Sequence, residues 1–300
     1  MIFTQEHDAI RKTVSQFIDK EINPYCDQWE KEGIFPAHDL FKKMGELGLL
    51  GINKPVGYGG MGLDYSYQIV FTEELGRIRS GGVSMAIGVQ TDMATPALAK
   101  HGSDLLRGKY LDKAISGEAV FSIAVSEPHA GSDVAAIKTT AVKDGDDYII
   151  NGSKMWITSS TQADYLCVLL NTKGDNPHKN KSMVIVPTDL PGVSFSEKLD
   201  KLGMRSSDTA QVFFDNVRVP QENLVGKEGM GFIYQMEQFQ EERLYCAAAN
   251  LKCLEFCIED TVEYVKERHV FGKPILNNQV VYFRLAELQT EIAALRALTY

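Results

Sequence analysis

The sequence lacks any apolar run approaching the roughly 18–20 residues that a membrane-spanning helix requires. Its first residues, Met-Ile-Phe-Thr-Gln-Glu-His, also lack the basic start and the apolar stretch of a signal peptide. The sequence therefore predicts a protein without a membrane span. We expect it in the cytoplasm, or in the mitochondrial matrix if its source is eukaryotic.

Cysteine is scarce and scattered, at positions 26, 167, 246, 253 and 257, with no Cys-x-x-Cys pair. This pattern disfavours a disulfide framework and favours buried free thiols in a reducing compartment. Cys253 and Cys257 lie four residues apart in an apolar helical pattern, where cysteine acts as a small hydrophobic residue. The six histidines show no ligand-like spacing. We expect no metal site.

An excess of basic residues is also missing, because 31 Lys and Arg face 40 Asp and Glu, for a net charge of −9. This balance argues against a nucleic-acid-binding or membrane-surface protein, both of which usually carry a basic face. Any phosphorylated ligand must then be held by local donors. With 300 residues and 44% hydrophobic composition, the chain can bury a substantial core in two or three domains.

The periodicity of apolar residues changes twice along the chain. Residues 1–118 have apolar side chains at helical spacing, with Ser103 as a plausible helix cap. Residues 119–226 have short β-branched or aromatic runs divided by turn signals. Residues 227–300 return to helical spacing, with a long apolar stripe from Leu244 to Val265. The predicted fold class is α+β: an N-terminal helical domain, a middle antiparallel β domain and a C-terminal helical bundle that looks truncated.

Within the β segment, the pair Asn151-Gly152 separates two runs, Tyr148–Ile150 and Lys154–Thr158. Asn-Gly is the strongest short hairpin signal, because both residues accept the positive φ of a type I′ turn. We therefore expect a hairpin turn there, and another turn at 144–147.

Residues 57–62, Gly-Tyr-Gly-Gly-Met-Gly, match the dinucleotide-binding pattern G-x-G-x-x-G. That function requires a strand before the glycines and a βαβ unit around them. Here Pro55 precedes them and helical patterns flank them, so we interpret the stretch as a helix–helix loop.

Four stretches occur in the order found in acyl-CoA dehydrogenases, and their spacing is similar to that family's. They are "SEPHAGSD" at 126–133, "NGSKMWIT" at 151–158, "KLGMRSSDT" at 201–209 and "ERHVFGKPI" at 267–275. The chain resembles this family from Thr4 to Tyr300. The resemblance implies FAD as cofactor and an acyl-CoA thioester as substrate.

The first stretch leaves an apolar run through small residues. Gly131 and Ser132 can present backbone donors to phosphate or carbonyl oxygens, although a turn capped by its own Asp133 fits the same residues. The resemblance implies that Val125, Ser126 and Ser132 contact FAD or the acyl-CoA.

The second stretch places Trp156 and Thr158 two residues apart, so that on a regular strand they share a face. A tryptophan on a strand is otherwise usually a core residue. The resemblance assigns the indole to the isoalloxazine ring and the Thr158 hydroxyl to a ring heteroatom. It also implies that Arg268, Phe271 and Gln279 reach the FAD of a neighbouring subunit. Arg268 offers donors suited to a pyrophosphate, but also fits a solvated cation at a helix end.

Dehydrogenation between Cα and Cβ of a thioester requires a carboxylate base in a mostly apolar cleft. Most members of the family place this glutamate in a C-terminal segment that the present chain does not contain. Members of the isovaleryl and long-chain types place it within a Glu-Arg-Leu string, which here is Glu242-Arg243-Leu244. We expect Glu242 to be the base and Arg243 to orient the CoA. A solvated acid in the first turn of a helix is the alternative, and it suits the neighbouring Glu241.

The position of Glu242 favours a branched or longer acyl chain, and residues 1–7 and 85–93 resemble members that act on a methyl-branched terpenoid chain. The resemblance implies an electron-transferring flavoprotein as electron acceptor and a homo-oligomer, a tetramer in this family. Two other hypotheses remain: an acyl-CoA oxidase, and a non-catalytic flavin- or CoA-binding assembly protein of the same fold. Neither nucleic acid nor a membrane is expected as a partner.

Overall fold

The computed structural model describes residues 3–172, 174 and 176–300. Met1 and Ile2, which open the stretch compared above at residues 1–7, lie outside the described residues. Contacts divide the chain into two compact units. We call residues 1–24, 65–79 and 243–300 the helical unit, and residues 25–64 and 80–242 the sheet unit. The division into segments at 118 and 226 stays a prediction.

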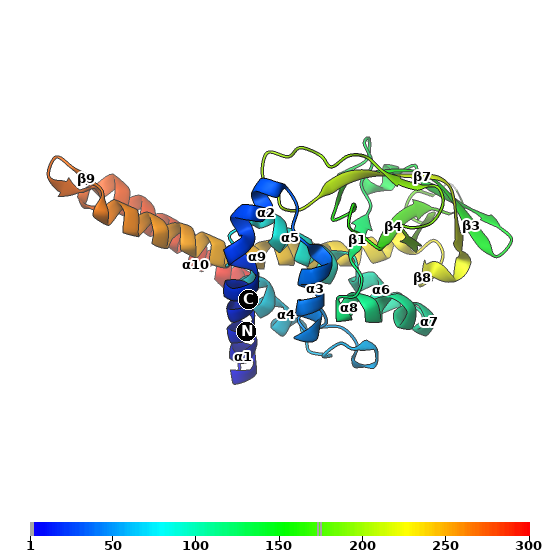
Figure 1. Ribbon diagram of the computed structural model, residues 1–300, viewed down its shortest axis with the longest axis horizontal. Coiled ribbons are helices and arrows are strands. Elements are labelled where there is room, and N and C mark those ends of the chain that lie inside the picture. The colour runs from blue at the N-terminus through cyan, green and yellow to red at the C-terminus, as the bar shows by residue number, and fades with distance from the viewer. Residues whose placement is uncertain (1–2, 173, 175) are drawn as a thin grey trace. The chain divides into compact units, whose positions relative to one another are not determined.

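The helical unit is built from α1 (Gln5–Phe17), α4 (Tyr65–Leu75), the second part of α9 (Gly231–Glu267) and α10 (Gln279–Thr299). The antiparallel strands β9 (His269–Val270) and β10 (Lys273–Pro274) join α9 to α10, and the two helices run side by side as a long hairpin (Figure 1). Phe271 and Gly272, both with positive φ, turn the chain there.

Ion pairs tie these helices together within the helical unit. Glu73 of α4 accepts hydrogen bonds from Arg11 of α1 at 3.0 Å and from Arg296 of α10 at 2.8 Å. The hydroxyl of Tyr300 also donates to Glu73. These donors hold the pKa of the Glu73 carboxyl below its ordinary value, although burial opposes them. The chain ends are therefore anchored to α4 by charge as well as by apolar packing.

The sheet unit contains the short helices and the β-sheet. Its helices are α2 (Cys26–Glu32), α3 (Ala37–Glu46), α5 (Gly81–Gly88), α6 (Pro96–His101), α7 (Asp104–Leu106), α8 (Asp112–Ser116) and residues 231–242 of α9. Its strands are β1 (Phe121–Ala124), β2 (Thr140–Asp144), β3 (Asp147–Thr158), β4 (Tyr165–Asn171), β5 (Lys181–Pro187), β6 (Val193–Phe195), β7 (Thr209–Pro220) and β8 (Leu224–Val225). Ser103 caps α7, as predicted, by accepting a hydrogen bond from the Leu106 N–H.

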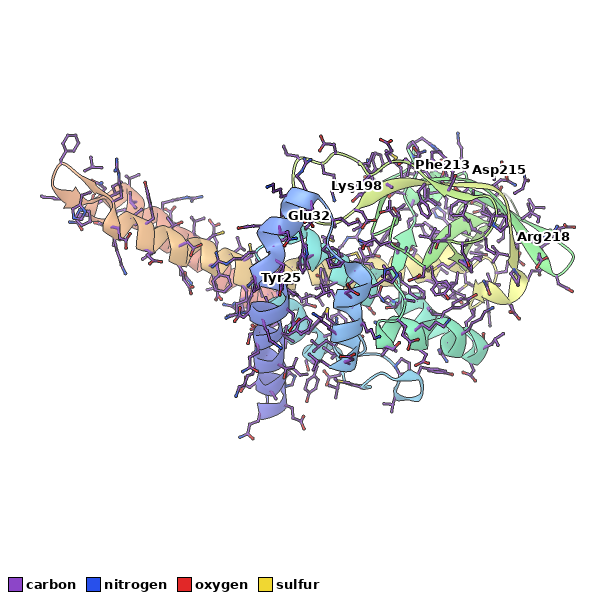
Figure 2. All side chains as sticks on the ribbon, viewed as in Figure 1. Tyr25, Glu32, Lys198, Phe213, Asp215 and Arg218 are labelled. Atoms are coloured by element: carbon purple, nitrogen blue, oxygen red, sulfur yellow. The ribbon has the colours of Figure 1, made fainter. Side chains whose placement is uncertain are left out.

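The sheet has the order β6-β7-β3-β2-β4-β5-β8, and β1 pairs in parallel with β4. Antiparallel pairing dominates, with β3 and β7 forming the longest pair. The side chains of Phe213, Asp215 and Arg218 follow one another along β7 (Figure 2). β4 and β5 are almost continuously apolar and buried, the pattern of strands covered on both faces.

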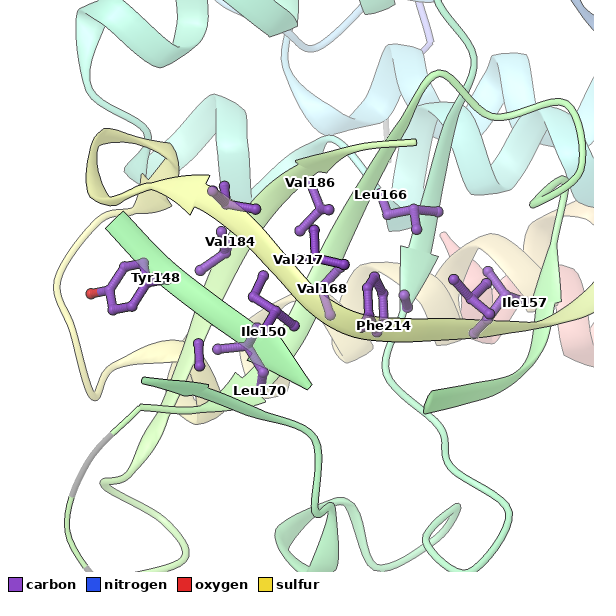
Figure 3. Packing of buried hydrophobic residues seen from close by; sticks show 14 of the residues in the cluster. Tyr148, Ile150, Ile157, Leu166, Val168, Leu170, Val184, Val186, Phe214 and Val217 are labelled. Carbon is purple, nitrogen blue, oxygen red and sulfur yellow. The ribbon is translucent and has the colours of Figure 1, made fainter. Parts of the chain in front are cut away.

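Side chains of this sheet form one apolar core, shown in part in Figure 3. Its labelled members are Tyr148, Ile150, Ile157, Leu166, Val168, Leu170, Val184, Val186, Phe214 and Val217. Burial of this many large aliphatic side chains, at about 1.5–3 kcal/mol each, supplies the main force that holds the strands in register. The α+β prediction, with helical, β and helical segments in that order, is confirmed.

The hairpin predicted at Asn151-Gly152 is wrong. β3 runs unbroken from Asp147 to Thr158, and its register with β7 shifts between Ile150 and Gly152. Gly152 has φ +143°, and an added Cβ would lie 2.7 Å from the Cα of Thr139. Between the pairs Ile150–Val217 and Gly152–Phe214, Asn151 lies opposite two residues of β7, Asp215 and Asn216, so the dipeptide continues the strand opposite a β-bulge of β7. The turn predicted at 144–147 is present, with Gly145 at φ +61°.

The expectation of buried cysteines is wrong for three of the five. Cys26 and Cys167 are buried, but Cys246, Cys253 and Cys257 are exposed on α9. The apolar stripe along this helix is only partly covered within the helical unit, where Leu251 and Val265 are buried and Leu254 is exposed. The glycine-rich stretch at 57–62 lies in a loop after a short helical turn, as interpreted from the sequence. None of the helices in the described part of the chain combines the length and apolarity needed to cross a bilayer.

Candidate active site

The stretch 126–133 leaves β1 and closes a tight turn. The backbone N–H of Glu127 donates to the carbonyl of Ala130 at 2.9 Å, and the reciprocal bond measures 3.0 Å. Pro128 and His129 form the exposed tip. The turn is thus held by Glu127 and Ala130, and no hydrogen bond from Asp133 that caps it is seen among the described residues.

The carboxylate of Glu127 is an internal anchor for this stretch. Its side chain is 2% exposed and lies 2.8 Å from the Nζ of Lys154, whose side chain is 0% exposed. It also accepts hydrogen bonds from the N–H and the hydroxyl of Thr139, at 3.0 and 2.7 Å. Lys154 completes the link by donating to the carbonyl of Val125 at 2.9 Å. The end of β1 is therefore fixed to β3 and to the start of β2.

This anchor was not found from the sequence. The only signal was a lysine within a run of strand residues, and that signal does not reveal its partner. Burial lowers the pKa of Lys154 to about 8, although the charge of Glu127 raises it. The same pair holds the pKa of Glu127 below its ordinary value against the effect of burial.

After the turn, Gly131 and Ser132 are exposed. An added Cβ at Gly131 would meet no atom within 4 Å. The backbone at this point therefore borders open space, the property that a close backbone approach to a ligand needs. Neither packing nor a positive φ explains a glycine here, so a ligand contact is its best physical explanation.

Trp156 lies at a second irregularity of β3. The register with β7 shifts between Lys154 and Ile157, and Trp156 has φ +61°, a left-handed conformation unusual for a bulky residue. Its side chain is 54% exposed, so it is not a core residue. The neighbouring N–H of Met155 donates to the carbonyl of Ser126 at 2.9 Å. The bulge thus presents the indole beside the point where Val125 and Ser126 leave β1.

The end of β3 supplies hydroxyl groups. Thr158 is half-buried, and its carbonyl accepts a hydrogen bond from Ser122 of β1 at 2.8 Å. The hydroxyls of Ser159 and Ser160 are buried and have no hydrogen-bond partner among the described residues. Buried polar groups are normally paired, so two adjacent unpaired hydroxyls point to a missing ligand or water. Sequence reasoning missed both serines, which resemble ordinary turn residues.

The third stretch, 201–209, holds this strand end in place. The carbonyl of Asp208 accepts from the N–H of Ser159 at 2.9 Å, and its carboxylate accepts from the N–H of Thr161 at 2.7 Å. Gln162 donates to the same carboxylate at 2.9 Å. Asp208 therefore has a structural role next to the unpaired serines.

Glu242 is half-buried on α9, within the sheet unit. Its Oε1 accepts hydrogen bonds from Gln235 at 3.2 Å and from Gln238 at 3.4 Å. Burial, and next the charge of Glu242, raise the pKa of the Cys167 thiol on β4 to about 12. Cys167 pairs with Ile123 of β1, two residues before Val125. The charge of Glu242 thus acts on β4, the strand that pairs with β1, and β1 leads to the 126–133 stretch.

The idea that Glu241 and Glu242 occupy the first turn of a helix is wrong, because α9 begins ten residues earlier than Glu241, at Gly231. Glu241 is half-buried, and burial raises its pKa, opposed mainly by the charge of Lys54. Lys54 is itself buried and donates to the carbonyl of Thr91 at 2.7 Å. Glu241 therefore faces an internal cation and is not a solvated acid.

Four residues predicted for the site, Arg243, Arg268, Phe271 and Gln279, belong to the helical unit. Arg243 is exposed, next to Glu242 in the sequence. Arg268 is exposed where α9 ends, Gln279 is exposed at the start of α10, and Phe271 lies between β9 and β10. Phe271 is 100% exposed with φ +52°.

No group of three His, Cys, Asp or Glu side chains suitable for a metal ion occurs in the described ranges of the chain. At the end of β3, among the described residues, the unpaired buried polar groups are the hydroxyls of Ser159 and Ser160, and Trp156 exposes an aromatic ring. That set suits a flat, polar, organic ligand.

Comparison with known protein families identifies the family of this chain. The N-terminal domain of the acyl-CoA dehydrogenases matches residues 4–118, the middle domain 122–217 and the C-terminal domain 229–300. The chain therefore belongs to the acyl-CoA dehydrogenase family, whose members are FAD-dependent oxidoreductases.

Among its relatives is isovaleryl-CoA dehydrogenase of Oryza sativa, 37% identical over 100% of this chain and 73% of the relative. Another is the long-chain specific acyl-CoA dehydrogenase of Sus scrofa, 37% identical over 99% of this chain and 69% of the relative. Both relatives are described as mitochondrial.

Solved structures are similar over nearly the whole chain. An acyl-CoA dehydrogenase from Geobacillus kaustophilus superimposes with a TM-score of 0.94 at 41% identity, over 99% of this chain and 78% of that one. One from Bacillus anthracis, complexed with FAD, gives 0.93 at 31% identity, over 99% and 50%. A structure from work on the electron transferring flavoprotein of Acidaminococcus fermentans gives 0.94 at 35% identity, over 100% and 78%.

The residues at the end of β3 fit a flavin. Trp156 offers an exposed ring, Ser159 and Ser160 offer buried unpaired hydroxyls, and Gly131 borders open space. These features are independent of the family match, and each is explained by a bound planar cofactor with hydrogen-bonding edges.

Proposed function

We propose that the protein dehydrogenates an acyl-CoA thioester between Cα and Cβ, to the 2-enoyl-CoA, with Glu242 as the base that removes the Cα proton. One observation carries the proposal: the half-buried carboxylate of Glu242 is close enough to β4 for its charge to act on a buried thiol there. Its charge acts on Cys167 of β4, and β4 pairs with β1, which runs into Val125 and Ser126.

FAD is the proposed cofactor, and bound there it accepts the hydride from Cβ. Trp156 would pack against its ring, and Val125, Ser126, Gly131, Ser132 and Thr158 would supply further contacts from the loop after β1 and from the end of β3. The φ of Trp156 supports this role, because a strained backbone at an exposed ring persists where the surroundings fix it and function uses it. Ser159 and Ser160 add hydroxyls that a ligand can satisfy.

Glu242 suits proton abstraction through its surroundings. It is half-buried, it accepts hydrogen bonds from two amide donors, and its charge acts on the buried thiol of Cys167 on β4. A positioned carboxylate contributes about 10²–10⁴-fold to such a proton transfer. Glu241 is not proposed for this role, because its nearest opposing charge is the internal cation of Lys54.

The proposed substrate has a branched or medium-to-long acyl chain. The relatives named for isovaleryl-CoA and for long-chain acyl-CoA support this class, and the Glu242-Arg243-Leu244 string agrees with it. Ser132 and Arg243 are the proposed contacts with the CoA portion, because both are exposed and carry donors for phosphate or carbonyl oxygens.

Arg268, Phe271 and Gln279 are proposed to contact the FAD of a neighbouring subunit in a homotetramer. Their exposure on a helical hairpin supports an intermolecular role. We further propose that electrons leave to an electron-transferring flavoprotein, and that the protein acts in the cytoplasm or in the mitochondrial matrix.

The test is a titration of the FAD-loaded protein with a series of acyl-CoA thioesters, straight and methyl-branched, under anaerobic conditions. Loss of the oxidised flavin absorbance, with formation of the matching enoyl-CoA, is the expected result. A flavin that no member of the series bleaches would contradict the proposal and favour a non-catalytic binding protein. Rapid reoxidation of the reduced protein in air would instead favour an acyl-CoA oxidase.

A further inference from the structure

Two glutamines stand on the same face of α9 as Glu242. Gln235 and Gln238 precede it by seven and four residues, a spacing that stacks side chains along one helix face. Gln235 is 0% exposed and Gln238 is 2% exposed. Buried glutamine is uncommon, and each buried amide needs partners. Both donate to the Oε1 of Glu242, as described above.

The orientation of the Gln238 side-chain amide is fixed by its hydrogen bonds. Its Oε1 accepts a hydrogen bond from the backbone N–H of Ala97, near the start of α6, at 3.1 Å. Since the amide oxygen is engaged there, the amide nitrogen must point the other way, toward Glu242. The α6 backbone thus fixes which end of the side chain faces the carboxylate.

Gln235 differs in a way that is useful for a test. Its Oε1 is buried and has no hydrogen-bond partner among the described residues. Leaving a buried acceptor unpaired destabilises a protein. A methionine of similar size would satisfy the same packing without this cost. Among the described residues, the donor bond to Glu242 is the one hydrogen bond that this amide makes, so packing alone does not explain a glutamine here.

Other ionisable groups face this part of α9. Cys167 lies on β4, and its thiol stays protonated because its pKa is raised to about 12. Glu241 is adjacent in sequence, with Lys54 and Asp92 acting on it. Arg243, exposed, follows Glu242 directly. Replacing Gln235 or Gln238 removes none of these ionisable groups. A comparison of variants at the two glutamines therefore tests the two amides.

We propose that Gln235 and Gln238 are positioning residues for the base, and that their amide donors hold the Glu242 carboxylate in one orientation and as the anion. The inference rests on the proposed function, in which Glu242 removes the Cα proton. Donors to an ionised carboxylate favour the charged form. A base kept ionised by two donors stays competent at a lower pH than the same base without them.

The main test is the pH dependence of flavin reduction by an acyl-CoA in the Gln235→Met variant of the FAD-loaded protein. The acid limb of the rate profile reports the pKa of the base. We expect the acid limb of the variant to lie about one pH unit higher than that of the parent. At a pH below the acid limbs of both proteins, the variant should then be about tenfold slower. The thermal midpoint should stay equal or rise, because the unpaired oxygen is removed. Gln240→Met, at an exposed site on the same helix, is the matched control and should leave the profile unchanged.

Gln238→Glu is a second variant, in which a carboxyl group replaces the amide. It keeps an oxygen to accept from Ala97, but places a second carboxyl beside Glu242, and like charges raise the pKa of the pair. We expect an upward shift of the limb at least as large as in Gln235→Met. If both variants bind FAD and the acid limb of their pH profiles lies at the same pH as in the Gln240→Met control, the glutamines are packing residues and the inference is overturned.

A readout without hydride transfer separates this inference from the proposed function. A thioester with sulfur in place of Cβ has no hydride to give, yet its Cα protons can exchange with D2O if the base removes them. We expect slower exchange at low pH in Gln235→Met than in the Gln240→Met control. Glu242→Gln should abolish exchange. Exchange at the parent rate in Glu242→Gln would overturn the assignment of the base itself. If Glu242→Gln loses exchange but the acid limb of the pH profile does not move in the glutamine variants, only the inference about the glutamines is overturned.

Discussion

The Oε1 of Glu127 lies 2.8 Å from the Nζ of Lys154, and both side chains are excluded from solvent. The pair joins the turn after β1 to β3 at the position two residues before Trp156. It therefore sets the geometry of the proposed flavin contacts without being one of them.

Removing one charge of this pair should strongly destabilise the fold. Glu127→Gln leaves the Lys154 ammonium buried without its anion, and breaking a buried pair costs about 3–5 kcal/mol. Glu127→Gln combined with Lys154→Met should recover much of the loss, because no uncompensated charge remains. Denaturant unfolding of the two variants and the parent checks this, and equal losses in both variants would contradict it.

The loss in the free energy of unfolding caused by Glu127→Gln should also depend on pH. In the parent, the Glu127 pKa is below its ordinary 4.5, so its contribution is present above that value and is lost as pH falls through the folded pKa. On the alkaline side, the folded Lys154 pKa of about 8 lies below its ordinary 10.5, so stability rises with pH between them. Without Glu127 the Lys154 pKa falls further, and this rise begins at a lower pH. The loss should therefore be largest between about pH 5 and 7 and shrink on both sides.

Two glycines should respond differently to alanine. Gly152→Ala places a Cβ against Thr139 at φ +143°, so we expect a loss of about 1–3 kcal/mol in the free energy of unfolding. Gly131→Ala meets no atom within 4 Å, so stability should change by less than about 0.5 kcal/mol. Its methyl group instead enters the space proposed for the ligand, and affinity for FAD or acyl-CoA should fall. Unchanged affinity in Gly131→Ala would argue against a ligand contact there.

Much of the fold follows from patterns that local physics fixes. The switch from helical spacing to short β-branched runs near Ala119, and back after Gly231, is visible because burial imposes each period. Asn151-Gly152 failed as a hairpin signal because the positive φ of Gly152 and its close approach to Thr139 are used inside β3, opposite a bulge of β7. The choice between a hairpin and a continuous strand depends on pairing with β7, which lies more than fifty residues further along the chain.

The site was less accessible to sequence reasoning. Trp156 and Glu242 were found through a family resemblance, but the positive φ of Trp156 is a tertiary property that no local pattern reveals. Gln235 and Gln238 resemble ordinary polar helix residues until the fold buries them beside Glu242. Their importance depends on α6 and on the strands behind them, which only the three-dimensional structure brings together.

Trp156 should matter for the cofactor more than for the fold. Trp156→Gly relieves the positive φ at the cost of chain entropy, so the free energy of unfolding of the apoprotein should change by less than about 1 kcal/mol. Loss of ring stacking should weaken FAD binding by about 3–10-fold, from the 0.5–1.5 kcal/mol typical of aromatic contacts. Fluorescence titration of the apoprotein with FAD measures this, with Trp156→Phe as the control that keeps a ring. Equal affinity in all three proteins would remove Trp156 from the flavin site.

The most direct measurement is the rate of anaerobic flavin reduction by a bleaching acyl-CoA in Glu242→Gln and, beside it, in Glu241→Gln. We predict a loss of about 10²–10⁴-fold in Glu242→Gln, with FAD still bound, because only the base is removed. Glu241→Gln should reduce its flavin within a few-fold of the parent rate and lose stability instead, since Lys54 then loses one opposing charge and keeps only that of Asp92 among the two that act on it. A parent-like rate in Glu242→Gln, or the large loss in Glu241→Gln alone, would contradict the assignment of Glu242 as the base.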